Sequence, residues 1–227
     1  MKAEIIAVGT ELLMGEILNS NSRDIARELY NLGIDVYHQS VVGDNLNRVS
    51  KELETAFERA DLVITTGGLG PTRDDLTKEA AAHFLKREMI LDEASIKHLE
   101  EFFGSRGLPL NEGNKRQAYF PEGAKIIPNE NGTAPACIIE FDEKVLVILP
   151  GPPREVIPLM EKYIIPYLEK RTGKVFISDI INISGIGEGH MEEKIMDIIE
   201  AQENPTVAPY AKEHGLTLRV TASASTE

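Results

Sequence analysis

The sequence predicts an α/β protein in which helices sandwich a mostly parallel sheet, followed by a small α+β module. Two observations support this fold class. Short apolar runs alternate with segments whose apolar residues recur at helical spacing, and the connections between them are short. A polar seam at residues 170–173 then separates this pattern from a second set of elements. We therefore place one domain at residues 1–171 and another at residues 172–227.

Two of the expected strands of the first domain, at residues 5–8 and 62–66, are apolar runs of the kind that is buried on both faces. A second strand is expected at 34–41, and strands at 136–141 and 145–149 are expected to form a hairpin. Helical spacing predicts helices that carry Ile25 to Leu32, Leu46 to Phe57, Leu76 to Arg87 and Ile96 to Phe103. Asn21 or Ser22 is suited to cap the first helix, Gly33 to end it, and Asp92 to cap the last. A further helix at residues 156–169 must be distorted or broken by its two prolines.

The second module begins with a strand at residues 175–183, followed by a glycine-rich turn at 185–189 and a helix around 192–200. Two more strands complete it. The last strand alternates, so that one set of residues is expected to face one way: Leu216, Leu218, Val220, Ala222 and Ala224. The chain ends where this strand ends, which indicates a truncated protein and an incomplete module.

Composition excludes several classes of function. The chain has 227 residues, with 24 Lys and Arg against 37 Asp and Glu, so its net charge is -13. No excess positive charge is available to displace counterions from a nucleic acid, although a small phosphorylated ligand remains compatible. The start has no signal-peptide core and no run is long enough to span a membrane, so we expect a cytoplasmic protein. The one cysteine, Cys137, cannot form an internal disulfide, and its apolar surroundings predict a buried side chain.

A glycine-rich segment, TTGGLGPTRDD at residues 65–75, follows the strand at 62–66 and precedes a predicted helix. In a parallel sheet this position lies at the carboxyl edge, where ligands of open α/β folds collect. Gly67, Gly68 and Gly70 allow the backbone to approach an anion and to turn several N–H groups toward it. The segment lacks the lysine of a Walker A loop and the third glycine of a dinucleotide fingerprint. It therefore predicts an anion site without specifying the anion.

Asp74 and Asp75 adjoin this loop and would repel a phosphate unless a cation lies between them. Such carboxylates suit Mg²⁺ or Mn²⁺, which bridge protein carboxylates and substrate phosphates. The alternative is that one of them caps the helix that begins at Leu76. Asp44, after the second strand, is either a cap for the helix at Leu46 or a third acidic ligand, and the pattern alone favours the cap.

Polar residues also follow the first strand, at Thr10, Glu11, Asn19 and Asn21, on the same edge of the sheet. They either bind a ligand or satisfy backbone groups of turns. Three further polar or Gly/Pro-rich segments border predicted elements: NEGNKRQ at 111–117, NENGTAP at 129–135 and PGPP at 150–153. We expect at least one of these segments to be a functional loop.

These segments together resemble the CinA family (competence/damage-inducible protein A). The matching stretches are GTELLMGEILNSN at 9–21, VVGDN at 41–45, DLVITTGGLGPTRDDLT at 61–77, NKRQAYFPEGA at 114–124, NGTAPA at 131–136, LPGPPRE at 149–155, GIGEG at 185–189 and LRVTASA at 218–224. The resemblance covers essentially the whole chain, and the glycine-loop stretch is its most specific part. One departure is Ala136-Cys137, where the family usually has glycine and a bulky residue.

The resemblance implies a molybdopterin-binding-like α/β domain, a KH-like α+β module, and an ADP-ribose pyrophosphatase activity that needs a divalent metal ion such as Mg²⁺, Mn²⁺ or Co²⁺. Family members often carry a further C-terminal domain that deamidates nicotinamide mononucleotide. This sequence stops before such a domain, so we do not expect that activity from it.

For hydrolysis of ADP-ribose to AMP and ribose 5-phosphate, we expect Asp44, Asp75 and Lys115 to be catalytic, and Asp74 or Asp75 to hold the metal. The expected substrate contacts are Thr10, Glu11, Asn19, Thr66, Gly67, Gly68, Gly70, Thr72, Asn131, Thr133 and Gly151. Two alternatives stay open: a molybdopterin-binding or adenylylating protein, and a non-enzymatic nucleotide sensor. The partner expected is a small nucleotide, with no nucleic acid and no membrane, and the open final strand favours a homodimer.

Overall fold

The structure is a computed structural model that describes residues 1–212 and 215–225, with the backbone alone described at 174–176, 211 and 212. The chain divides into two compact units. Met1–Tyr30 and Ile34–Pro166 form the first, and Asn31–Gly33 belongs with the residues from Tyr167 onward in the second. The division runs through helix α8 (Ile165–Thr172).

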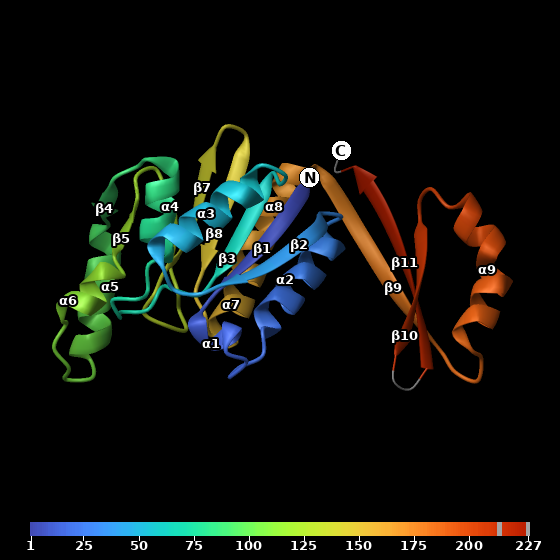
Figure 1. Ribbon diagram of the computed structural model, residues 1–227, viewed down its shortest axis with the longest axis horizontal. Helices are drawn as coiled ribbons and strands as arrows, with labels where there is room; N and C mark the ends of the chain where they lie inside the picture. Colours follow the sequence, from blue (N-terminus) through green and yellow to red (C-terminus); the bar gives the residue numbers. More distant parts are fainter. Residues whose placement is uncertain (213–214, 226–227) are drawn as a thin grey trace. The chain divides into compact units, whose positions relative to one another are not determined.

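The first unit contains a six-stranded sheet in the order β2-β1-β3-β8-β7-β6 (Figure 1). Its strands are β1 (Lys2–Val8), β2 (Asp35–Val42), β3 (Leu62–Thr66), β6 (Lys125–Ile127), β7 (Ala136–Phe141) and β8 (Lys144–Leu149). The four strands from β2 to β8 run parallel, whereas β7 is antiparallel to both of its neighbours. This confirms the predicted α/β fold with a mostly parallel sheet.

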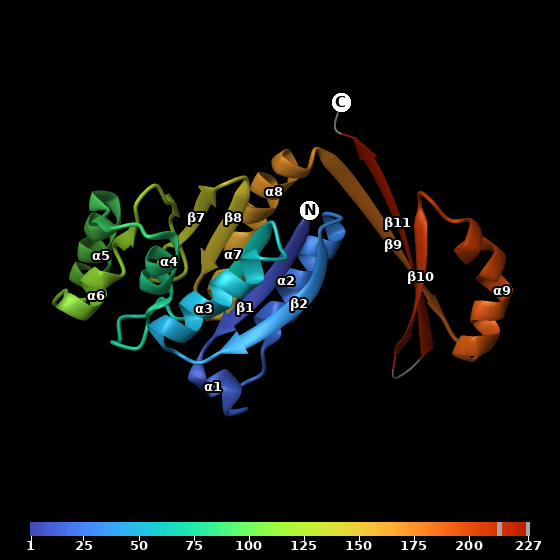
Figure 2. The same ribbon diagram turned by 45° about the horizontal axis from the view of Figure 1, so that its top comes forward.

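Helices cover both faces of this sheet, as the turned view makes clear (Figure 2). α3 (Leu46–Phe57) and α4 (Thr77–Leu85) lie on one face, and α2 (Ser20–Asn31) and α7 (Pro153–Leu159) lie on the other. The rings of Phe57, Phe84 and Phe141 join α3, α4 and β7, with ring centroids 4.9 to 5.9 Å apart. Cys137 on β7 is fully buried, as predicted, and burial raises the pKa of its thiol to about 12.

The ends of the helices agree with the prediction only in part. Gly33 follows α2 with a φ of 62°, and Asp92 accepts a hydrogen bond from the Ser95 N–H, as expected. The prediction that Asn21 or Ser22 caps α2 is wrong, because the Asn19 side chain accepts from the Ser22 N–H at 3.2 Å. The predicted distortion around the prolines is confirmed, since α7 passes through a π-helix, η1 (Met160–Ile164), into α8.

Five further elements belong to the first unit, and all of them except one helix are short. They are α1 (Thr10–Leu13), β4 (Met89–Leu91), α5 (Glu93–Gly104), α6 (Glu112–Arg116) and β5 (Tyr119–Pro121). β4 and β5 pair with each other as a separate two-stranded sheet. Of these five, sequence periodicity predicts only α5, because the others are too short to show a repeat.

The second unit is an antiparallel sheet in the order β10-β11-β9 with one helix. Its elements are β9 (Lys174–Ile183), α9 (Glu188–Ala201), β10 (Thr206–Lys212) and β11 (Gly215–Ser225). Its small core contains Met191, Leu216 and Leu218. Two predictions need correction. α9 begins inside the expected glycine-rich turn, at Glu188, and the alternating face of β11 is buried only at its start, because Ala222 and Ala224 are exposed.

Within the ranges 1–212 and 215–225, no helix combines the length and the apolar character that a membrane span needs.

Candidate functional site

A cleft of about 290 Å³ lies at the carboxyl edge of the six-stranded sheet, where β1, β3 and β8 end. Open α/β sheets bind their ligands at this edge. The residues lining it are Val8, Glu11, Leu12, Ile17, Leu18, Asn19, Ser20, Asn21, Thr66, Gly67, Gly151, Pro152 and Pro153. The predicted contacts among them are Glu11, Asn19, Thr66, Gly67 and Gly151, so parallel topology brings together residues that are far apart in the sequence.

The glycine loop after β3 has a conformation that only glycine adopts without strain. Gly67 has a φ of 104° and Gly68 a φ of 67°. A Cβ on Gly67 would lie 2.0 Å from the Val8 carbonyl oxygen, and one on Gly68 would lie 2.1 Å from the Thr77 hydroxyl. The two glycines therefore allow the loop to pack against β1 and α4, a structural role that the sequence alone does not reveal.

The loop also leaves backbone donors free. Gly67 N–H donates to the Leu149 carbonyl at 3.0 Å. In the part of the chain that the structure describes, the N–H groups of Gly68, Leu69 and Gly70 have no hydrogen-bond acceptor. Successive free N–H groups after a strand form the kind of concavity that binds anions. The loop thus keeps the donors that the prediction of an anion site requires.

Asn21 ties three segments of the cleft together. Its Nδ2 donates to the Thr66 hydroxyl at 2.8 Å and to the Gly151 carbonyl at 2.7 Å. The Thr66 hydroxyl in turn donates to the Pro150 carbonyl at 2.7 Å. The Asn21 Oδ1 is buried and has no partner among the described residues. The position of Asn21 after the first strand predicts this edge of the sheet, but the sequence pattern does not reveal its bonds to Thr66 and Gly151.

Asp44 is fixed by the loop after β1. Its Oδ2 accepts hydrogen bonds from Thr10, at 2.7 Å from the N–H and 2.8 Å from the hydroxyl. The interpretation of Asp44 as a helix cap is wrong, because Asn45 caps α3 by accepting from the Arg48 N–H. Thr10 and Asp44 are brought into contact as predicted for one sheet edge, but neither lines the cleft itself.

Asp75 closes the end of the glycine loop. Its Oδ2 accepts from the Thr72 N–H at 2.9 Å and from the Thr72 hydroxyl at 2.6 Å. The capping alternative is wrong for both aspartates, because α4 begins after Leu76 without a side-chain cap. Asp74 is exposed and makes no hydrogen bond or ion pair to the described residues. Asp75 therefore holds the loop's shape, and one of its carboxylate oxygens stays free.

Lys115 and the 129–135 segment lie apart from the cleft lining. Lys115 forms an ion pair with Glu112 at 2.6 Å, which raises the pKa of the Lys115 ammonium. Thr133 is half-buried, and Asn131 is exposed with its N–H donated to the Asn129 side chain. The structure does not gather Asp44, Asp75 and Lys115 into one pocket.

The carboxylates of this site suit a divalent ion only if the ion is also bound by a phosphorylated ligand. Across residues 1–212 and 215–225, no group of three or more His, Cys, Asp and Glu side chains converges as a metal site. Asp44 and Asp75 each use one carboxylate oxygen locally, and the other oxygen of each has no partner among the described residues. Mg²⁺ commonly uses one or two carboxylates together with substrate phosphates and water. The donor set therefore fits an ion that arrives with a phosphorylated ligand, and it does not form an all-protein cage.

A buried lysine supports the glycine loop from the side of α4. Lys78 is 4% exposed and donates from Nζ to the Gln117 carbonyl at 2.6 Å. Gln117 in turn donates from Nε2 to the Leu69 carbonyl at 3.0 Å. Sequence analysis missed this chain of bonds, because lysine on a helix is ordinarily exposed and no pattern marks it as buried.

Burial lowers the pKa of Lys78 to about 8 from its ordinary 10.5. Between these pH values the unfolded chain binds more protons than the folded chain, so the free energy of unfolding should rise with pH. We expect wild type to gain about 3 kcal/mol relative to Lys78→Met between pH 8 and 10.5. Urea unfolding of both proteins over this range measures the difference, and an exposed-site control, Lys170→Met, should show none. Parallel pH profiles for wild type and Lys78→Met would contradict the prediction.

The fold and the cleft define an open α/β domain whose ligand site lies at the carboxyl ends of its strands. Residues 4–170 match the probable molybdopterin binding domain, and residues 178–227 match the damage-inducible protein CinA KH domain. The chain belongs to the CinA family, as the resemblance in its motifs predicts.

Three relatives support this assignment. The crystal structure of CinA from Thermoplasma acidophilum, described as a protein of unknown function, is 33% identical, with a TM-score of 0.68 over 75% of this chain and 96% of that one. A protein of Alkaliphilus oremlandii named as competence-damage inducible is 62% identical, and a CinA-like protein of Dictyoglomus thermophilum is 54% identical. Both comparisons cover 100% of this chain and 55% of the relative, so the chain spans about half their length.

Proposed function

We propose that this chain binds ADP-ribose at the carboxyl-edge cleft and hydrolyses its pyrophosphate to AMP and ribose 5-phosphate. The observation that carries the proposal is the row of free N–H groups at Gly68, Leu69 and Gly70 beside the cleft. A chain with a net charge of -13 repels a diphosphate in general. Local amide dipoles can offset that repulsion at one place.

Polar groups around the cleft are suited to a sugar. Asn19, Ser20 and Asn21 line one side, and Glu11 lies close by with its carboxylate beside Gly9. Ribose hydroxyl groups are donors and acceptors, and carboxylate and amide oxygens can accept from them. We assign Asn131 and Thr133, on the neighbouring loop, to further contacts with the same substrate.

Hydrolysis requires water to attack one phosphorus while the bond to the bridging oxygen breaks. The water proton leaves to solvent, and the bridging oxygen departs on the second phosphate, which gives two monophosphates. The free oxygen of Asp75 would hold the divalent ion, either Mg²⁺, Mn²⁺ or Co²⁺, and we assign the free oxygen of Asp44 to the same role. When bound, such an ion polarises a phosphoryl oxygen and lowers the pKa of an attacking water. The loop N–H groups would bind the remaining phosphate oxygens.

An Asn21→Asp variant tests the cleft. A carboxylate cannot donate to Thr66 and Gly151, and it adds a negative charge beside the phosphate site, so AMP release should fall at least about tenfold, or about 1.4 kcal/mol. The assay follows AMP chromatographically after incubation of purified protein with ADP-ribose and each ion. Asn47→Asp, an exposed site on α3, makes the same change elsewhere and should leave turnover unchanged. Absence of AMP release by wild type with all three ions would refute the proposed function.

The match of residues 4–170 favours a second candidate, binding of molybdopterin or its adenylylation. Calorimetric titration with molybdopterin and ADP-ribose distinguishes the two ligands. A third candidate, a nucleotide sensor, predicts that ADP-ribose binds without any turnover.

A further inference from the structure

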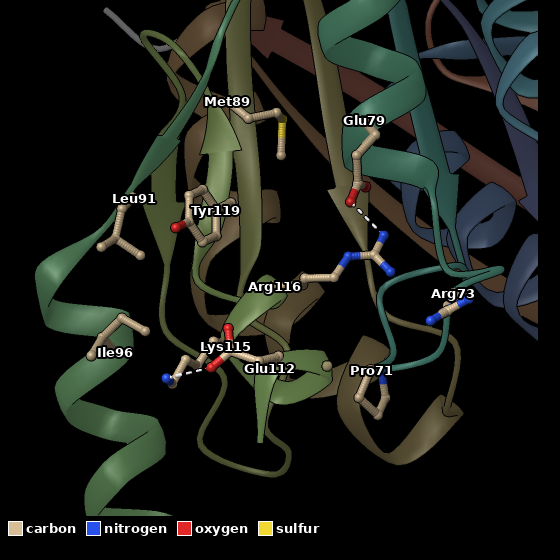
Figure 3. A pocket seen from close by; sticks show the side chains of 11 residues that line it. Pro71, Arg73, Glu79, Met89, Leu91, Ile96, Glu112, Lys115, Arg116 and Tyr119 are labelled. Atoms are coloured by element: carbon tan, nitrogen blue, oxygen red, sulfur yellow. Dashed lines mark hydrogen bonds and ion pairs between the residues drawn. The ribbon is translucent and has the colours of Figure 1, made fainter. Parts of the chain in front are cut away.

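A second pocket of about 720 Å³ adjoins the glycine loop on another side (Figure 3). We call it the α6 pocket, because helix α6 forms one wall; the loop residues Pro71 and Arg73 and strands β4 and β5 form others. It shares no lining residue with the cleft. Its volume is well within the range of about 300–1,000 Å³ typical of small-molecule sites, whereas the cleft is at the lower limit.

One wall of the α6 pocket is apolar. Met89, Leu91, Ile96 and Tyr119 lie together on the side opposite Arg116 (Figure 3). Leu91 is 40% exposed and Tyr119 is 38% exposed, so their apolar surfaces are open to a ligand. A tyrosine ring beside aliphatic side chains offers a flat surface for a planar ring. The cleft, in contrast, has no aromatic residue in its lining, and its hydroxyl and amide groups come from Asn19, Ser20, Asn21 and Thr66.

The other side chains that line the α6 pocket include two acidic and three basic ones. Lys115 pairs with Glu112 at 2.6 Å, and Arg116 pairs with Glu79 at 2.8 Å, so these four side chains neutralise one another. Arg73 is exposed and has no acidic partner within the described residues. The pocket therefore carries one uncompensated positive charge in a chain that is otherwise strongly acidic. Such a charge favours a phosphate.

The α6 pocket and the cleft share the glycine loop as a common wall. Arg116 donates to the Thr72 carbonyl at 3.2 Å and to the Asp75 carbonyl at 3.4 Å. Gly113 packs so closely on the loop that a Cβ there would lie 2.6 Å from the Pro71 carbonyl oxygen. A ligand whose phosphates lie over the loop can thus extend one end toward each pocket.

We propose that the α6 pocket binds the adenosine half of the substrate, with the base against Tyr119 and Leu91 and Arg73 at the adjoining phosphate. This inference rests on the proposed function. It assigns the two halves of the substrate to the two pockets according to their chemical character. The planar base goes to the pocket that offers an aromatic ring, and the second ribose goes to the cleft, where Asn19, Ser20 and Asn21 offer polar groups. It also gives Lys115 a place at the substrate, on the adenosine side.

The test is calorimetric titration of the whole chain with AMP and, separately, with ribose 5-phosphate. The two probes carry the same phosphate, and only AMP carries the base. We expect wild type to bind AMP at least about tenfold more tightly than Tyr119→Ser or Arg73→Glu, because base stacking and a phosphate contact are each lost. Tyr119→Phe keeps the ring and should bind AMP as wild type does. Lys170→Glu, a charge reversal at an exposed residue that does not line the pocket, should have no effect.

Several outcomes would overturn the inference. AMP affinity that is unchanged in Tyr119→Ser and Arg73→Glu, or lost only in Asn21→Asp, would place the nucleotide elsewhere. Failure of AMP to bind while ADP-ribose is hydrolysed would refute the α6 pocket and leave the proposed function standing. AMP binding that depends on Arg73 and Tyr119, without hydrolysis of ADP-ribose, would support the pocket and refute the function. Circular dichroism melting of each variant confirms that its fold is intact.

Discussion

Asp75→Asn should hydrolyse ADP-ribose at least about tenfold more slowly than wild type, which corresponds to about 1.4 kcal/mol or more in the activation barrier. An asparagine oxygen can still accept both hydrogen bonds from Thr72, so the loop should keep its shape. The change replaces the free carboxylate oxygen by an NH₂ group, which cannot bind a cation. The readouts are the rate of AMP release and its dependence on the concentration of Mn²⁺.

The matched control for this variant is Asp35→Asn, an equally isosteric change at the exposed start of β2, on the opposite edge of the sheet. Its rate should equal that of wild type. The urea midpoint of Asp75→Asn should also stay near that of wild type. Wild-type turnover with unaltered dependence on Mn²⁺ in Asp75→Asn would rule out a role for this carboxylate in holding the ion.

Gly67→Ala should lower the free energy of unfolding by about 3 kcal/mol or more. The residue has a φ of 104°, and the added methyl group would lie 2.0 Å from a backbone oxygen that cannot move without shifting β1. Strain in the backbone and overlap with it therefore act together. Urea unfolding followed by far-UV circular dichroism measures the loss, and the protein contains no tryptophan that would offer a simpler signal.

Gly151→Ala is the control, because the two glycines are neighbours across the cleft. A Cβ on Gly151 would have as its nearest neighbour the Gly67 Cα at 3.7 Å, an ordinary contact. We expect a change in stability within about 1 kcal/mol, together with weaker ADP-ribose binding because the methyl group enters the cleft. Equal stability losses in the two variants would show that the close packing of the loop on β1 is not what requires glycine at position 67.

Much of the fold could be predicted from the sequence, because the central strands carry strong local signals. The strand Leu62–Thr66 is an apolar, β-branched run that ends in two glycines, and its predicted bounds are those observed. The same is true of Ala136–Phe141, which ends at the turn Asp142–Glu143. β4, β5 and β6 have three residues each, too few for alternation to appear, and they form only because a partner strand is close.

The candidate site could be predicted in position but not in detail. Parallel topology alone places the segments after β1, β3 and β8 at one edge, and Glu11, Thr66 and Gly151 do line the cleft there. The hydrogen bonds of the site join residues that are distant in sequence, such as Thr10 with Asp44 and Asn21 with Gly151. Such pairs depend on side-chain directions in the folded chain, which no single-sequence pattern records. For the same reason Asn45 rather than Asp44 caps α3, and Asn19 rather than Asn21 or Ser22 caps α2.

The reversed direction of β7 has a consequence for how this domain could diversify. Because β7 runs against β8, the segment that leads into it, residues 128–135, enters the sheet at the same edge where the parallel strands leave it. The Asn129 and Glu155 side chains anchor this segment at 2.7 Å, close to the start of α7. Insertions or exchanges between these fixed points would change the surface at this edge of the sheet without altering the strand order. The 128–135 loop is therefore the part of this edge that can vary most while the sheet stays the same.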